Sequence, residues 1–422
     1  MEWLGHAKTT FTHSPNPLSL TKKDGTSTDL VSICREATPP CRLNPLLFNG
    51  HLQTMWTAIK NHGPSIYYKR KVFENEDPNF KGSFAVDFVV SPFPETDESL
   101  PPRTVHFTED EFENFGLTDT RPMLVVLHGL SGGSHEIYLR QVLAPLVTVE
   151  GDRQWAACVV NSRGCAMHKI TTDVLYNARA TWDCRQTVKW LRRTFPNRPL
   201  YGIGFSLGAN ILTNYVGEEG SSCMLRAAVV CSSPWNLDVG NMALQRTWLG
   251  REVYSKTMGT SMKKLIEIHY DELSKGSKLD FAKIRQVNYL HEFDREVQGS
   301  TWGYATEGAY YRDASSVDSL LAVRIPLFAI SAKDDPIAAD EALPYNEMKQ
   351  TKYGVLCTTT QGGHLSWFEI GGTRWHARPA VNFLNKMAFE VELNAPGNLN
   401  GSVKVELDDD TRFKPMNRKW AL

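Results

Sequence analysis

The sequence predicts an α/β fold, in which a mostly parallel sheet of about eight strands carries helices on both faces. Short, continuous apolar runs alternate along the chain with helical patterns. This alternation is typical of parallel strands that are buried on both faces and joined by helical crossovers. The runs expected to be such strands are residues 123–127, 156–160, 200–204, 227–231, 326–330 and 355–358. Before them, residues 65–73 and 84–90 alternate between apolar and polar side chains, which predicts an antiparallel pair at one edge of the sheet.

Helical patterns separate the expected strands. We expect helices at residues 137–149, 179–193, 207–215, 340–349 and 378–392. One interval breaks this rhythm, because residues 234–323 separate two strands by about 90 residues where a plain crossover needs roughly a dozen. Two stretches within it, MALQRTWLG and MKKLIEIHYDEL, are amphipathic. We therefore expect an inserted lid over these residues.

The domain organisation follows from these patterns. The 422 residues fit one enlarged α/β domain with an insertion and extended termini. We expect an N-terminal arm packed on the core at residues 1–60, the first part of the core at 61–233, the lid at 234–323, the second part of the core at 324–393 and a C-terminal extension at 394–422.

Composition excludes several classes of function. The chain has 46 Lys and Arg against 47 Asp and Glu, so it lacks the broad positive field of a nucleic-acid-binding protein, and no nucleic-acid partner is expected. Its eight cysteines show no C-x-x-C or Cys/His clustering, so neither a metal site, a cofactor nor a disulfide framework is predicted. The start of the chain has no signal-peptide pattern, and no run of 18 apolar residues occurs. These features predict an intracellular protein without a transmembrane segment.

The segment 204–208 reads GFSLG and lies between an expected strand and an expected helix. In this G-x-S-x-G pattern the glycines permit a tight turn that presents the hydroxyl of Ser206 at the carboxyl edge of the sheet. A second match, GLSGG at residues 129–133, also follows a strand but leads into a flexible loop. Since the N-terminus of a helix stabilises negative charge, Ser206 is preferred over Ser131 as the nucleophile.

A serine needs a histidine as general base and a carboxylate to orient that histidine. In folds with this motif the partners follow in the order serine, acid, histidine. Asp334 and Asp335 follow the expected strand at 326–330, and His364 lies in a glycine loop after the strand at 355–358. Both therefore arrive in the required order and at the carboxyl edge of the sheet.

Two choices remain among these partners. Asp335 is preferred as the acid because it directly precedes the proline of its loop, and Asp334 is then expected to cap or brace the turn. His376 is a rival base, but it has no glycine loop and is expected to open the last helix. We therefore predict Ser206, Asp335 and His364 as a catalytic triad.

A serine acyl-transfer reaction also needs donors for the oxyanion. The backbone N–H of Leu207, directly after the nucleophile, is one candidate, and the N–H of Leu130 in the loop after the strand at 123–127 is the other. The second G-x-S-x-G match, at residues 129–133, is therefore expected to supply an oxyanion donor and not the nucleophile. Arg163, at the end of a neighbouring strand, is expected to brace the structure, with substrate contact as the alternative.

Taken together, these motifs resemble the α/β-hydrolase subfamily that holds fungal medium-chain fatty acid ethyl ester synthase/esterases, also called alcohol O-acyltransferases, and mammalian abhydrolase-domain lipases. The resemblance covers about residues 40–390. It rests on Asn44-Pro45, Gly50-His51-Leu52-Gln53-Thr54, the segments 128–134 and 204–210, Phe293-Asp294, Tyr310-Tyr311, Asp334-Asp335-Pro336 and Gly362-Gly363-His364. By this likeness Ser206, Asp335 and His364 take the triad roles.

The resemblance implies a serine esterase that acts on medium-chain fatty-acyl esters through an acyl-enzyme, in a ping-pong reaction with water or an alcohol as acceptor. Transfer of the acyl group of acyl-CoA to an alcohol would be a second outcome. It also implies peripheral association with a lipid droplet or endomembrane. An acyl-CoA or biosynthetic thioesterase, a peptidase and a non-catalytic ligand-binding protein are the competing interpretations. Aromatic residues of the expected lid, Trp235, Trp248 and Trp302, either form an acyl tunnel or pack in the core.

Overall fold

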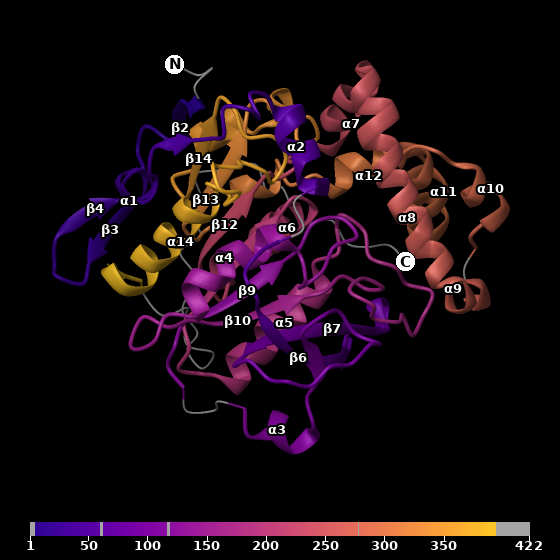
Figure 1. Ribbon diagram of the computed structural model, residues 1–422, viewed down its shortest axis with the longest axis horizontal. Coiled ribbons are helices and arrows are strands. Elements are labelled where there is room, and N and C mark those ends of the chain that lie inside the picture. The colour runs from indigo at the N-terminus through magenta and orange to yellow at the C-terminus, as the bar shows by residue number, and fades with distance from the viewer. Residues whose placement is uncertain (1–4, 60–61, 116–118, 277, 394–422) are drawn as a thin grey trace.

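The computed structural model describes residues 5–59, 62–115, 119–276 and 278–393. Its centre is a ten-stranded sheet in the order β2-β14-β13-β12-β11-β9-β10-β7-β6-β8, with helices on both faces (Figure 1). The strands, in chain order, are β2 (Thr9–His13), β6 (Tyr67–Glu74), β7 (Ser83–Val90), β8 (Thr104–His106), β9 (Met123–Leu127), β10 (Ala156–Val160), β11 (Leu200–Phe205), β12 (Leu225–Cys231), β13 (Leu327–Ala332) and β14 (Gly354–Thr359).

The predicted parallel strands are confirmed. Strands β10, β9, β11, β12, β13 and β14 pair in parallel in that order, so their carboxyl ends meet at one edge. Strands β6 and β7 pair antiparallel as predicted, but they are not the edge of the sheet. The short strand β8 pairs in parallel with β6 beyond them, and β2 pairs antiparallel with β14 at the opposite edge. These two strands raise the expected eight to ten.

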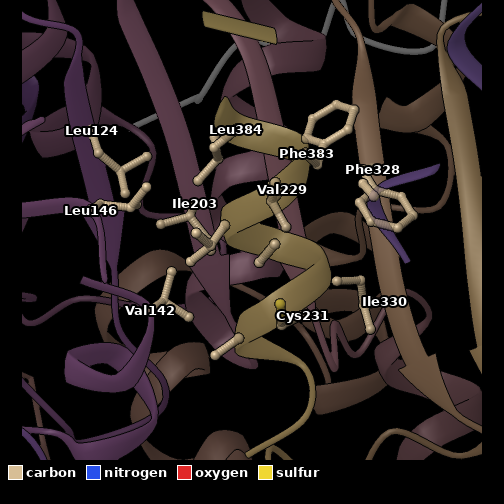
Figure 2. Packing of buried hydrophobic residues seen from close by; sticks show 14 of the residues in the cluster. Leu124, Val142, Leu146, Ile203, Val229, Cys231, Phe328, Ile330, Phe383 and Leu384 are labelled. Carbon is tan, nitrogen blue, oxygen red and sulfur yellow. The ribbon is translucent and has the colours of Figure 1, made fainter. Parts of the chain in front are cut away.

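Apolar side chains cover both faces of this sheet. On one face the central strands pack against α4 (Ile137–Val147) and α14 (Ala377–Asn385), and Figure 2 shows part of this cluster. Its labelled members are Leu124, Val142, Leu146, Ile203, Val229, Cys231, Phe328, Ile330, Phe383 and Leu384. On the other face the alternate residues of the same strands pack against α5 (Trp182–Thr194) and α6 (Leu207–Glu219). The loops at the carboxyl edge thus start from strands that are anchored on both sides.

Two expected helices are interrupted. The segment 340–349 forms a 3₁₀ turn, η6 (Asp340–Ala342), and a short helix, α13 (Tyr345–Gln350), because Pro344 lacks an N–H and disfavours helical backbone at the residue before it. The segment 378–392 begins as α14, passes through a π turn, and ends in β15 (Val391–Glu392), which pairs with β3 (Ser19–Lys22). Strand pairing with the N-terminal arm thus replaces the last turn of the expected helix.

The interval between β12 and β13 is helical. It holds α7 (Leu237–Arg246), a π-helical segment η4 (Gly250–Ser255), α8 (Lys256–Ile268), α9 (Tyr270–Gly276), α10 (Phe281–Gln286), α11 (Leu290–Trp302), α12 (Glu307–Ala314) and η5 (Ser319–Ala322). Helices α7 to α12 gather on one side of the molecule in Figure 1. That this interval acts as a lid stays a prediction.

The N-terminal arm joins the core at several points. Besides β2 and β3, it holds β1 (His6–Ala7), β4 (Ser27–Asp29), α1 (Leu30–Ala37), β5 (Cys41–Arg42) and α2 (Gly50–Ile59). Helix α1 packs against α14. The expected C-terminal extension, 394–422, lies outside the described residues. Within the described part of the chain, no helix has the length and apolarity needed to cross a membrane.

Candidate active site

Ser206 stands in a sharp turn between β11 and α6. Its backbone has φ 50° and ψ −120°, a conformation that costs about 1–3 kcal/mol in a non-glycine residue. A Cβ on Gly204 would lie 2.5 Å from the carbonyl oxygen of Gly208, and a Cβ on Gly208 would lie 2.4 Å from the carbonyl oxygen of His128. Both positions therefore require glycine for α6 to start directly beside the strands.

The structure brings Ser206, His364 and Asp335 together. The Ser206 Oγ lies 2.8 Å from His364 Nε2, and His364 Nδ1 lies 2.9 Å from Asp335 Oδ2 and 3.1 Å from Asp335 Oδ1. With the Nδ1 proton donated to the carboxylate, Nε2 is free to accept a proton from the serine hydroxyl. The His364 side chain is 11% exposed and that of Asp335 is 1% exposed, so the carboxylate is shielded from water while the imidazole is accessible.

The two neighbouring acids have different partners. Asp335 Oδ1 accepts the backbone N–H groups of Ile337 and Ala338, each at 2.8 Å, which fixes the carboxylate opposite the imidazole. Asp334 points elsewhere, and its Oδ1 accepts the backbone N–H of Gly363 at 3.0 Å. Burial, together with the charge of Asp335, raises the pKa of Asp334 to about 6. Asp334 therefore braces the loop that carries the histidine.

The N-terminal arm supports the same histidine loop, a role that the sequence patterns did not reveal. The backbone N–H of His364 donates to Thr54 Oγ1 at 2.9 Å, and the Thr54 hydroxyl donates to the carbonyl of Gly50 at 2.7 Å. Buried Gln53 accepts the N–H of Phe368 and donates to the carbonyl of Leu47. The contacts of the arm with His364 and Phe368 join residues that are more than 300 positions apart in the sequence. The GHLQT motif at 50–54 was therefore the only sequence signal that could have pointed to a role for this segment.

The two predicted oxyanion donors lie beside Ser206. Leu130 and Leu207 both line the cavity that contains Ser206, and within the described residues neither backbone N–H has a hydrogen-bond acceptor. His128 orders the first loop, because its Nε2 accepts the N–H of Ser162 at 3.0 Å and its Nδ1 therefore donates to the carbonyl of Gly129 at 2.7 Å. Burial lowers the pKa of His128 to about 4, which keeps this ring neutral.

A cavity with an empty volume of about 790 Å³, partly open to solvent, adjoins Ser206. Its apolar lining includes Leu130, Leu207, Leu237, Leu244, Met258, Met262, Leu290 and Ile337. None of the three lid tryptophans lines it: Trp235 is fully buried, Trp248 is 72% exposed, and Trp302 packs against Trp182. The alternative of a tryptophan tunnel is therefore wrong for this cavity, whose mostly apolar lining has Tyr176, Tyr310 and Tyr311 as its aromatic members.

A family model described as alpha/beta hydrolase fold matches residues 122–369, more than half of the chain. The chain belongs to this α/β-hydrolase family. Among curated relatives, a monoacylglycerol lipase of Saccharomyces cerevisiae is 33% identical over 386 residues, which are 86% of this chain and 84% of the relative. A medium-chain fatty acid ethyl ester synthase/esterase 2 of the same yeast is 28% identical over 389 residues, 82% of this chain and 85% of the relative. A phospholipase ABHD3 of Mus musculus is 30% identical over 253 residues, 59% of each chain.

In this α/β-hydrolase chain, Ser131 and His376, the alternative candidates for nucleophile and base, form no hydrogen bonds to the partners that these roles require within the residues that the structure describes. The N–H of Ser131 is bonded to the Tyr176 hydroxyl, and no histidine hydrogen-bonds Ser131 in the described part of the chain. His376 is fully buried against Phe205, and burial lowers its pKa to about 3. It lies inside the core, and neither of its ring nitrogens has a hydrogen-bond partner among the described residues.

Arg163 is part of the buried framework. Its guanidinium pairs with Asp183 through two hydrogen bonds of 2.9 and 2.8 Å and also donates to the carbonyls of Phe80 and Lys81. The side chain is 1% exposed and does not line the cavity. The structure therefore places Arg163 in the bracing position, and substrate contact at this cavity is excluded.

Proposed function

We propose that the protein is a serine carboxylic-ester hydrolase that cleaves fatty-acyl esters through an acyl-enzyme on Ser206. The observation that carries this proposal is the chain of contacts from Ser206 Oγ through His364 to buried Asp335, beside a cavity with a mostly apolar lining. Apolar walls favour an acyl chain, and a few convergent polar groups set its orientation. The lipase and esterase names of the relatives support the same class of reaction.

In the proposed reaction, His364 Nε2 removes the Ser206 proton as Oγ attacks the ester carbonyl carbon. Asp335 holds the Nδ1 proton and stabilises the imidazolium that forms. The negative carbonyl oxygen of the tetrahedral intermediate accepts hydrogen bonds from the N–H groups of Leu130 and Leu207. Collapse of the intermediate breaks the bond to the alcohol, which takes the proton from His364. Water then attacks the acyl-enzyme by the same steps and releases the free acid.

The nucleophile can be tested by labelling with a fluorophosphonate, which forms a covalent bond with an activated serine. We expect the wild type and Ser131→Ala to be labelled and Ser206→Ala to lose labelling, because only the Ser206 hydroxyl contacts an imidazole. Labelling is measured by intact-mass spectrometry. Loss in Ser131→Ala alone would overturn the assignment, and an inert wild type would favour the non-catalytic ligand-binding interpretation.

The two acids give a matched pair of variants. Asp335→Asn is expected to lower kcat by about 10³- to 10⁴-fold, because an amide cannot hold the imidazole in the required tautomer. Asp334→Asn is expected to lose less than about tenfold, since its amide oxygen can still accept the Gly363 N–H. Steady-state hydrolysis of a p-nitrophenyl ester measures both. Equal losses in the two variants would refute the separate roles.

We further propose alcohol O-acyltransferase activity and a preference for medium-chain acyl groups, supported by the name of the second yeast relative. The partition of an acyl-enzyme between water and alcohol depends on how far the site excludes water. Added ethanol is therefore expected to divert product from octanoic acid to ethyl octanoate, as measured by gas chromatography with octanoyl-CoA or an octanoyl ester as donor. A product ratio that does not respond to ethanol would exclude transfer. Turnover of the thioester alone would favour the thioesterase interpretation.

Peripheral contact with a lipid surface is also proposed. Helices α2 and α7 border the site and carry exposed apolar side chains, with Met242 53% and Trp248 72% exposed on or just after α7, and Phe48 57% exposed just before α2. Both elements contact η4, since His51 of α2 lies 2.8 Å from the Tyr254 hydroxyl and Thr247, which caps α7, bonds the Gly250 N–H. Such side chains gain free energy when they leave water for lipid.

The double variant Phe48→Ser, Trp248→Ser is expected to bind phosphatidylcholine vesicles at least tenfold more weakly, because two large apolar side chains are lost. Hydrolysis of a short, water-soluble ester should change little. Vesicle co-sedimentation measures the first quantity. Val149→Ser, 44% exposed after α4 at the amino edge of the sheet, is the control. Equal weakening by this control would contradict a specific docking face.

A further inference from the structure

A group of polar side chains interrupts the mostly apolar wall of the cavity beside Ser206. Asp294 and Gln298 lie one turn apart on α11, and Asn177 comes from the loop before α5. All three line the cavity, and they are only 6%, 3% and 2% exposed, respectively. The proposed triad makes no use of them, so their burial beside the reacting serine needs another explanation.

The hydrogen bonding of this group is incomplete. Asp294 accepts the Tyr311 hydroxyl at 2.8 Å and a side-chain hydrogen bond from Gln298, but it forms no ion pair within the described residues. Because the Gln298 amide donates to Asp294, its Oε1 atom is left over, and this atom has no partner in the described part of the protein. Asn177 Nδ2 is equally unpartnered, while its Oδ1 accepts the Arg179 N–H. A buried donor and a buried acceptor without hydrogen-bond partners cost free energy, and a bound ligand that hydrogen-bonds both would remove this cost.

The chemistry of these atoms selects a neutral, hydroxylated ligand. Gln298 Oε1 and the Asp294 carboxyl accept hydrogen bonds, and Asn177 Nδ2 donates one. A hydroxyl group satisfies both kinds of site because it donates and accepts. A phosphate group does not fit, since among the described residues no lysine or arginine lines the cavity to offset the charge of Asp294. A plain alkyl group would leave both unpaired atoms buried.

We propose that Asp294, Gln298 and Asn177 form a subsite for the free hydroxyl groups of a polyol ester, of which a glycerol monoester is the simplest fatty-acyl example. This inference rests on the proposed ester hydrolysis at Ser206 and names the alcohol part of its substrate. Burial raises the pKa of Asp294 to about 7, so near neutrality this carboxyl can also donate a hydrogen bond to a hydroxyl oxygen. The same yeast lipase that resembles the chain is named for a monoacylglycerol substrate, which agrees with this chemistry.

The test uses three octanoyl esters that differ only in free hydroxyl groups: ethyl, with none; 2-hydroxyethyl, with one; and glyceryl, with two. For the wild type, kcat/KM is expected to rise along this series. In Gln298→Leu the ratio of glyceryl to ethyl ester hydrolysis is expected to fall about tenfold, because one acceptor is lost. Asp294→Asn, which keeps an oxygen for the Tyr311 hydroxyl, is expected to lower the same ratio. Fluorophosphonate titration of Ser206 corrects each value for the fraction of folded enzyme.

Gln286→Leu makes the same chemical change at an exposed position on α10 and should keep the wild-type ratio. If Gln298→Leu does not fold, Asp294→Asn decides the question. A wild type that hydrolyses all three esters equally, or variants that lose activity on all three in proportion, would overturn the hydroxyl subsite alone. A wild type that hydrolyses none of them and resists the fluorophosphonate would instead overturn the proposed function.

Discussion

The close approach of three backbone segments at Ser206 is the constraint on which the site depends. Strand β11 is paired on both sides and α6 is buried against the sheet. Because this packing fixes the backbone on both sides of Ser206, its strained conformation persists. The absence of side chains at Gly204 and Gly208 allows this approach, since a Cβ at either position would meet backbone atoms at 2.5 Å or less. The helix then starts directly at Leu207, whose N–H lies beside the serine and has no acceptor among the described residues.

The imidazole depends on a second set of contacts, and these come from distant parts of the chain. The loop of His364 is held by Asp334 at the end of β13 and by Thr54 of the N-terminal arm. A Cβ on Gly363 would lie 2.6 Å from the carbonyl oxygen of Gly50, so arm and loop are in direct backbone contact. The arm is further tied to the core through β2 and β3. Residues that look like a terminal extension in the sequence thus position the proposed general base.

The central strands and the three residues that meet at the site could be predicted because each has a local signal. Buried parallel strands give apolar runs, and Ser206 and His364 stand in glycine turns directly after such runs. Strands β2 and β8 gave no such signal, because β2 (TTFTH) is mostly polar and β8 has only three residues, and both are defined by pairing with segments far away in the sequence. The bracing by Thr54 and the polar group around Asp294 were also beyond local pattern analysis. Both depend on which side chains the tertiary fold brings together, and the helical period of α11 alone does not tell a buried aspartate from a solvated one.

The proposed catalytic residues and most of the proposed hydroxyl subsite lie on different parts of the chain. Ser206, Asp335 and His364 follow strands of the sheet, whereas Asp294, Gln298 and Tyr311 belong to helices of the insertion. Catalysis requires that the reacting atoms keep their geometry within tenths of an ångström, and a sheet packed on both faces supplies that rigidity. Recognition of the alcohol part of the ester requires only that a few polar atoms in the cavity lie within hydrogen-bond distance of its hydroxyl groups. Changes in the insertion can therefore alter the preference for the alcohol part of the ester without moving the serine, and the unpaired Oε1 atom of Gln298 on α11 is where such a preference would be set.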